Sequence, residues 1–315
     1  MKLTFDSSLR SLLLLLVASL AAQAQTPTPT PPAATEDIFV VDVKAAKGRI
    51  EFGQPVNITN RAGYDNQPSF LPEGTSLLYT SQREGDQTDI YRYDFKTGQS
   101  ARLTSTPEGE YSPTLMPGGK FFSVIRVEAD KTQRLWKFPL AGGEPSLVLP
   151  NIKPVGYHLW LDARTLALFI LGAEGRPNTL QLVPTDISFL DTIHVNIGRA
   201  LHLVPRRAAF SFVHKISPDE WLVKIFDLKT HRSTTLTKTL PGSEDLAWTP
   251  DGTSILMAQD ARLFQYNLAA PADGWQQVAD FSAAGLKRIT RLALSPGADR
   301  LALVAQNEDV RRVAK

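Results

Sequence analysis

Polar and apolar positions alternate along short segments of the chain, and turns that contain glycine or proline separate these segments. The clearest segment covers residues 88–95, Thr-Asp-Ile-Tyr-Arg-Tyr-Asp-Phe, in which polar and apolar side chains largely alternate. A period of two is typical of a β-strand with one buried face. Similar short segments flank it at 76–80 and 100–104. We therefore predict four antiparallel strands within about 40 residues, the size of one β-propeller blade.

A turn recurs at a nearly constant interval along the chain. Its second residue is at position 72, 117, 162, 205, 250 and 296, which gives spacings of 45, 45, 43, 45 and 46 residues. In Thr249-Pro250-Asp251-Gly252, proline fixes the first φ angle and glycine accepts a positive one, as a tight turn requires. An apolar segment follows each turn. The repeats predict an all-β fold, a six-bladed β-propeller made of four-stranded antiparallel blades.

The sixth repeat contains only two strand-like segments before residue 315. The segment 36–43 resembles 88–95 position by position, and 55–59 corresponds to 100–104. We therefore expect the N-terminal strands to complete the last blade, which joins the two ends of the ring without a long unpaired edge. The predicted propeller domain covers residues 36–315.

The first 35 residues have a different composition. A charged start is followed by the apolar segment 11–22 and by Ala22-Gln23-Ala24, a pattern typical of a secretory signal peptide. We predict a signal peptide over 1–24, with cleavage after Ala24, and a semi-rigid Thr/Pro-rich linker over 25–35. The apolar segment is shorter than the roughly 20 residues that span a bilayer, so an uncleaved anchor is the less favoured alternative. The mature chain is expected to be periplasmic or secreted, without membrane insertion.

Composition and motifs restrict the chemistry. The chain has 34 Lys and Arg against 32 Asp and Glu, a net charge of +2, and no cysteine. Near-neutral charge argues against a nucleic-acid surface, and the absence of cysteine excludes disulfides and thiol catalysis. No Gly-x-Ser-x-Gly motif occurs, and the five histidines lack metal-binding spacing. His158 and His202 fall on innermost strands and could both face the channel. We predict no enzyme activity and no cofactor. The alternative is a metal-dependent hydrolase or lactonase-like propeller with a site in the central channel.

The repeats resemble the WD40-like (PD40) repeats of TolB-type propellers. The resemblance is carried by residues 89–104, by Glu110-Tyr111-Ser112-Pro113 and by residues 249–252. It covers all six repeats, but the third and fourth depart from it, with Asp162 where proline is usual and Arg206-Arg207 in place of Asp-Gly. TolB members of the family carry an α/β domain before the propeller, and here only the Thr/Pro-rich segment precedes it. The resemblance therefore implies a stand-alone six-bladed propeller.

The channel mouth is the predicted binding site, because the loops that lead into the six innermost strands converge there. These loops carry tyrosines and charges of both signs, a surface that suits a protein or peptide better than a polyanion. The function we expect is that of a monomeric, exported scaffold that binds a protein or peptide partner in the cell envelope. A purely structural or sensory module with an ordinary polar rim is a further alternative. The candidate ligand-binding residues are Tyr64, Asp65, Glu110, Tyr111, Tyr157, His158, Arg199, Glu244, Asp245, Arg288 and Arg291.

Overall fold

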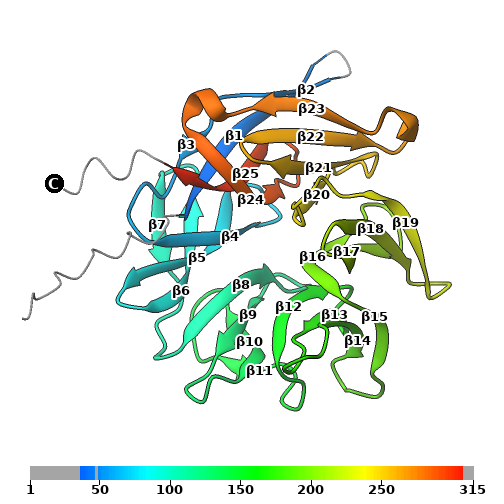
Figure 1. The fold of residues 1–315 in the computed structure, drawn as a ribbon. Helices are drawn as coiled ribbons and strands as arrows, with labels where there is room; N and C mark the ends of the chain where they lie inside the picture. Colours follow the sequence, from blue (N-terminus) through cyan, green and yellow to red (C-terminus); the bar gives the residue numbers. More distant parts are fainter. Residues whose placement is uncertain (1–35, 47–48, 308–315) are drawn as a thin grey trace, which may run out of the picture. The chain divides into compact units, whose positions relative to one another are not determined.

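The computed structural model describes residues 36–46 and 49–307, and strands make up nearly all of their regular structure. Within these ranges the helical elements are two short 3₁₀ helices, η1 (Pro271–Asp273) and η2 (Ser282–Ala284). No helix in this part of the chain has the length and apolar character to cross a membrane. The predicted signal peptide and linker lie outside the described residues. The sheets are arranged radially around a central axis (Figure 1).

Four separate sheets each contain four antiparallel strands in chain order. Each begins with an innermost strand next to the axis and ends with an outermost strand (Figure 1). In chain order, the four sheets contain β8 (Gly109–Leu115), β9 (Phe121–Val127), β10 (Gln133–Pro139) and β11 (Ser146–Leu147); β12 (Val155–Trp160), β13 (Thr165–Ile170), β14 (Thr179–Pro184) and β15 (Asp191–Val195); β16 (Ile197–Leu203), β17 (Ala209–Ser217), β18 (Glu220–Asp227) and β19 (Arg232–Lys238); and β20 (Leu246–Trp248), β21 (Ser254–Gln259), β22 (Arg262–Asn267) and β23 (Trp275–Asp280).

The fifth sheet has nine strands and joins the first repeat to the last. A single parallel bridge, between Glu36 and Tyr64, links its two antiparallel halves. If each half is counted as one blade, the strand order agrees with the six sequence repeats. The number of six blades is a prediction from the spacing of these repeats. One half contains β4 (Tyr64–Phe70), β5 (Ser76–Glu84), β6 (Gln87–Asp94) and β7 (Gln99–Arg102), and the other contains β24 (Leu286–Leu294), β25 (Arg300–Asn307), β1 (Glu36–Ala46), β2 (Arg49–Phe52) and β3 (Val56–Asn57).

Strand β1 joins the two ends of the fold. It pairs with β25 in antiparallel register over seven residue pairs, from Glu36–Gln306 to Asp42–Arg300. Strand β3 pairs with β1 on the other side, as expected for residues 55–59. The hairpin between β1 and β2 was not predicted. It forms because β1 continues to Ala46, beyond the length of one blade strand, and its last residues pair with β2.

The hydrophobic core lies between neighbouring blades. Phe122 and Phe138 of the second repeat stack with ring centroids 5.6 Å apart, and they belong to the same buried cluster as Ile90 of the first repeat. Two buried tryptophans also connect blades: Trp160 Nε1 donates to Ser123 Oγ at 2.9 Å, and Trp248 Nε1 donates to Ser211 Oγ at 2.8 Å. Large side chains therefore fill the space between blades, and their polar atoms find partners there.

Bulges interrupt most of the innermost strands. The pairing register shifts within β4, β8, β12, β16 and β24. In β4 and β8 the bulges contain Gln67 and Ser112, which have left-handed φ angles of 59° and 55°. A bulge changes the direction of the side chains that follow it relative to those that precede it. In the bulged strands it therefore determines which residues face the channel.

Candidate functional site

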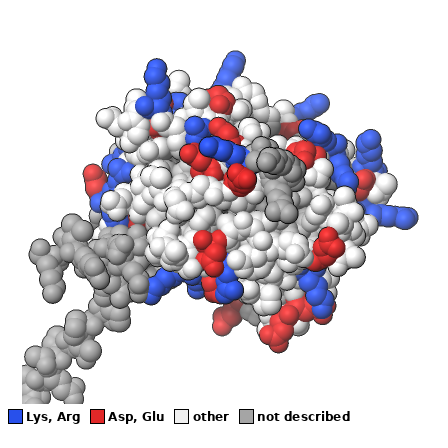
Figure 2. Space-filling view, turned by 90° about the horizontal axis from the view of Figure 1, so that it is seen from above, with Lys and Arg blue, Asp and Glu red and all other residues white. Residues whose placement is uncertain are grey.

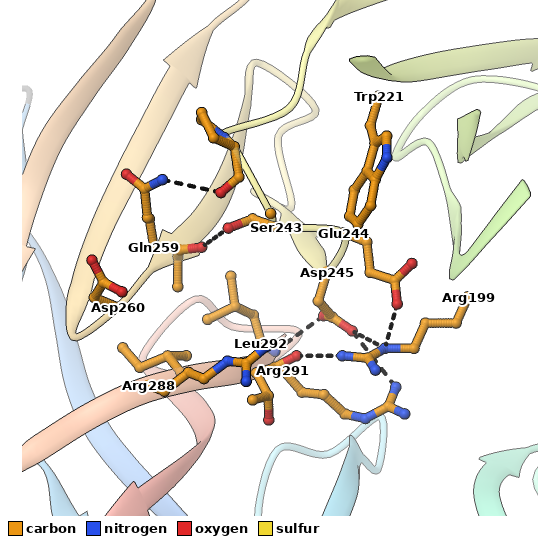
Figure 3. A pocket seen from close by; sticks show the side chains of 15 residues that line it. Arg199, Trp221, Ser243, Glu244, Asp245, Gln259, Asp260, Arg288, Arg291 and Leu292 are labelled. Carbon is orange, nitrogen blue, oxygen red and sulfur yellow. Dashed lines mark hydrogen bonds and ion pairs between the residues drawn. The ribbon is translucent and has the colours of Figure 1, made fainter. Parts of the chain in front are cut away.

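Two adjoining cavities lie at the axis and at one end of it. The larger, with a volume of about 600 Å³, is lined by residues of all six innermost strands, and we call it the channel. The smaller, of about 360 Å³, lies beside β16, the segment 241–245 and β24, and we call it the mouth pocket (Figure 3). The channel and the mouth pocket have lining residues in common, which are Arg199, Asp245, Arg291 and Leu292.

Arg199 connects three repeats at the mouth. Its Nε lies 3.5 Å from Glu244 Oε1 and 3.9 Å from Asp245 Oδ2. Its Nη2 donates to the Thr290 carbonyl oxygen of β24 at 2.7 Å. The guanidinium on β16 is thereby held against the segment before β20 and against β24 (Figure 3).

Asp245 lies between two guanidinium groups. Its Oδ1 accepts a hydrogen bond from the Leu292 backbone N–H at 3.1 Å, and its Oδ2 is 3.6 Å from Arg291 Nη1. Arg291 in turn donates from Nη2 to Tyr157 Oη at 3.1 Å. Since Arg291 belongs to β24 and Tyr157 to β12, this bond joins the last repeat to the third, between the mouth pocket and the channel.

The three candidate tyrosines are half-buried near Arg291. Burial raises the pKa of Tyr64, the positive charge of Arg291 lowers it, and Tyr157 and Tyr111 are close enough to raise it further. The Tyr64 hydroxyl therefore remains a hydrogen-bond donor at neutral pH. Tyr157 lines the channel, whereas Tyr64 and Tyr111 line neither cavity.

Asp65 and Glu110 lie inside the wall, which corrects the expectation that they form part of an exposed rim. Both side chains are 0% exposed. Asp65 accepts hydrogen bonds from Arg61 at 2.9 Å and Ser81 at 2.6 Å, and Glu110 accepts one from Thr106. Successive side chains of a strand point to opposite faces. Each carboxylate is therefore directed away from the neighbouring tyrosine.

His158 is a packed histidine in the channel wall. Its Nε2 lies 2.7 Å from Ser123 Oγ, and burial lowers its pKa to about 3. His202 also lines the channel, and burial lowers its pKa as well. Within residues 36–46 and 49–307, no group of three or more His, Cys, Asp or Glu side chains could hold a metal ion. The metal-dependent alternative finds no support in this arrangement.

Most of the candidate residues lie in strands, not in the loops that were expected. Tyr64, Tyr111, Tyr157 and Arg291 fall within β4, β8, β12 and β24, whereas Glu244 and Asp245 precede β20. Arg199 lies within β16 because the single residue Asn196 connects β15 to β16. Arg288 and Glu244 line the mouth pocket. Two residues on middle strands were not predicted to contribute to the site. They are Lys215, whose Nζ is 2.5 Å from Glu244 Oε2, and Trp221, which lines the mouth pocket. No motif marks either of them.

The pKa of Glu110 gives a pH-dependent prediction. Burial raises this pKa to about 7 from the ordinary value of 4.5, against the opposing effect of hydrogen bonds from Thr106 and Thr104. The pKa of Glu110 is higher in the folded protein than in the unfolded chain. The stability that protonated Glu110 contributes is therefore fully present below pH 4.5 and is lost as the pH rises through 7. We expect Glu110→Gln to leave the melting temperature unchanged at pH 4.5. At pH 8 it should raise stability by up to about 3 kcal/mol.

Thermal unfolding of the original protein and the variant at both pH values tests this prediction. Glu144→Gln is the matched control, because Glu144 is exposed. An equal change for Glu110→Gln at pH 4.5 and pH 8 would show that Glu110 ionises normally in the folded protein.

Comparison with known proteins shows similarity of fold. No protein-family model matches the chain, and no curated protein matches it. Among solved structures, a putative TolB from Agrobacterium tumefaciens has a TM-score of 0.66 and 13% sequence identity, over 87% of this chain and 99% of that one. TolB from Acinetobacter baumannii has a TM-score of 0.55 and 15% identity, over 87% of this chain and 64% of that one.

Two other solved structures are also similar to the chain. A structure of a nidogen/laminin complex has a TM-score of 0.59 and 10% identity, over 81% of this chain and 97% of that one. A puromycin-hydrolyzing peptidase from Mycobacterium tuberculosis has a TM-score of 0.53 and 11% identity, over 81% of this chain and 48% of that one. At these identities the comparisons show the fold alone. They confirm the predicted all-β propeller fold.

Proposed function

We propose that this propeller is a non-enzymatic interaction module that binds a segment of a protein or peptide partner at its channel mouth. The observation that carries the proposal is the convergence of Tyr157, Arg199, Asp245 and Arg291 from four different repeats on two adjoining cavities. Cavities of a few hundred Å³ are the usual size of ligand sites. Tyrosine and arginine are the residue types most often found at the energetic centre of protein interfaces.

The distribution of charge also favours a protein partner. On the face shown in Figure 2, Lys and Arg side chains are interspersed with Asp and Glu and with uncharged residues. A nucleic-acid-binding face would instead carry a continuous basic stripe. The mixed charges at the mouth would orient a partner more than they would add affinity, so binding should weaken moderately with salt.

The cellular setting of the proposal is the periplasm or the exterior, as an envelope scaffold. It rests on the signal-peptide pattern of residues 1–24, and the TolB-like fold is compatible with it. We propose that the protein acts as a monomer. A hydrolytic role would require a nucleophile with a base or a metal cluster, and among the described residues no group of His, Cys, Asp and Glu could hold a metal.

The proposal predicts that the tyrosines anchor the partner. Tyr157 lines the channel, and Tyr64 lies near Tyr157 and Tyr111 at its edge. Changing the three tyrosines together to alanine should reduce capture of the partner from an envelope extract at least tenfold, because each ring offers contact area and a polar tip. The melting temperature should fall by only a few degrees, because all three side chains are half-buried. Quantitative pull-down with the intact and variant propellers as bait measures the effect.

Two further variants complete this experiment. Tyr157→Phe retains the ring but removes the hydroxyl that accepts the hydrogen bond from Arg291, so it separates loss of contact area from loss of this bond. Gln265→Ala changes β22, away from the mouth, and should leave capture unchanged. Capture that survives the triple change but fails in Gln265→Ala would place the binding face on the outer wall of the ring.

A further inference from the structure

We infer that the mouth pocket recognises a carboxylate group on the bound segment, with apolar groups next to it that enter the channel. This inference rests on the proposed function and specifies the chemistry of the partner. It follows from the guanidinium of Arg288 in the mouth pocket, which is unpaired within the described ranges, from two buried hydrogen-bond donors and from the apolar lining of the adjoining channel.

The lining of the mouth pocket carries equal numbers of positive and negative groups, but one cation is left without a partner among the described residues. Three guanidinium groups line it, those of Arg199, Arg288 and Arg291, together with the carboxylates of Glu244, Asp245 and Asp260. Glu244 lies 2.5 Å from Lys215, and Asp260 lies 3.6 Å from Arg262. Asp245 lies between Arg199 and Arg291. Each lining carboxylate therefore has an ion-pair partner other than Arg288.

Arg288 is the lining arginine that is left without a carboxylate in the part of the chain that the structure describes. Its side chain is exposed, and it makes no ion pair with any residue of the described part of the chain. Figure 3 shows it extending toward the middle of the mouth pocket. A guanidinium in this position can donate two parallel hydrogen bonds to a carboxylate.

Two buried N–H groups lie in the same wall. Arg199 Nε and Arg291 Nε have no hydrogen-bond acceptor among the described residues, although carboxylate oxygens lie 3.5–3.9 Å from Arg199 Nε. Buried donors are rarely left without an acceptor, because the unmade bond costs free energy. An anionic oxygen from a ligand would add negative charge to the wall that holds these donors and would supply the counter-charge that Arg288 lacks.

The channel limits what can accompany this carboxylate. Beyond the shared arginines its lining is largely apolar, and includes Leu201, Trp248, Leu292, Leu294 and several prolines. Apart from the shared arginines, the described residues that line the channel include no Lys or Arg to bind a polyanion, whereas aliphatic or aromatic side chains would be well accommodated. Two sources fit this chemistry: the terminal carboxylate of a peptide that ends in apolar residues, and an Asp or Glu side chain within an apolar segment.

Three matched libraries of random hexapeptides, attached to beads through their N-termini, test the inference with the full chain labelled by a fluorophore. The first library has a free C-terminal carboxylate and no Asp or Glu. The second has the same composition but a C-terminal amide. The third is amidated and carries one Glu at a fixed position. The binding proteins are the original chain, Arg288→Gln and the control Arg232→Gln, which changes an exposed residue of the outer strand β19.

We expect the original chain to be retained about tenfold more strongly on the first or third library than on the second, as one charge-assisted interaction allows. Arg288→Gln should lose most of this preference, Arg232→Gln should keep it, and added salt should weaken it. Preference for the first library alone identifies a terminal carboxylate, and preference for the third alone identifies a side chain.

The failures are distinguishable. Equal retention on all three libraries would overturn the carboxylate inference and leave peptide binding intact. Retention on none of them would overturn the proposed function together with the inference. A preference that survives in Arg288→Gln but is lost in Arg232→Gln would place carboxylate recognition away from the mouth pocket and overturn the inference.

Discussion

Deletion of residues 36–60 is expected to leave a chain that aggregates or remains unfolded. The deletion removes β1, whose side chains fill two interfaces at once. Ile38 and Val40 pack in a cluster with residues of the first repeat, whereas Phe39 and Val41 pack in a cluster with residues of the fifth. All four are at most 8% exposed. Burial of each such side chain contributes about 1.5–3 kcal/mol, so their joint loss is comparable to the whole stability of a domain, about 5–15 kcal/mol.

Size-exclusion chromatography and thermal unfolding followed by circular dichroism measure this result. Deletion of residues 25–34, which leaves β1 intact, is the control and should not change the melting temperature. A chain without residues 36–60 that remained monomeric and melted like the intact protein would contradict the role of β1 in closing the ring.

Ile90→Ala is expected to lower the free energy of unfolding by about 2–5 kcal/mol, since truncation of a buried isoleucine removes contacts and leaves a cavity. Ile90 is 0% exposed. It belongs to the cluster between the first and second blades, together with Phe122 and Phe138. The change should therefore weaken one blade interface without altering either cavity at the axis.

Denaturant titration tests this expectation. The midpoint for Ile90→Ala should decrease while the slope stays the same, which would indicate lower stability without a change of the folded or unfolded ensemble. Gln99→Ala on β7 is the control, because Gln99 is exposed and nearby in the same blade. A midpoint shift for Ile90→Ala no larger than that for Gln99→Ala would show that this interface tolerates the cavity.

The fold could be predicted from the sequence because the patterns that specify it are short and recur in each repeat. The turn at residues 249–252 and the alternation within 88–95 each specify a short element, and the constant interval between turns specifies how the elements stack. The pairing of β1 with β25 was predictable because residues 36–43 repeat the pattern of a blade strand. The hairpin between β1 and β2 was not, since the alternation of Arg-Ile-Glu-Phe at 49–52 covers only four residues and matches no strand of the repeats.

The site could be predicted only in part, because the residues that face a cavity depend on the phase of each strand. A bulge changes this phase by one residue, and a shift of one residue exchanges the two faces of a strand. The bulges contain Gln67 and Ser112 in left-handed conformations. Neither residue type predicts such a conformation, so the bulges could not be located from the sequence. Tyr64 and Asp65 looked equivalent for a different reason: both were expected in a loop, whereas as neighbours in β4 they point to opposite faces, and Asp65 is buried in the wall.

The pairing of β1 with β25 has a consequence for the order of events during synthesis. Residues 36–42 leave the ribosome long before residues 300–306, their partners in the sheet. Until those residues emerge, the edge of β1 opposite β3 has no strand to pair with, and contacts between segments so distant in sequence form slowly. The nascent protein therefore passes through an open state in which β1 of one molecule can take the place intended for that of another. Low concentration, or a chaperone that covers β1, would favour closure of the ring within a single chain.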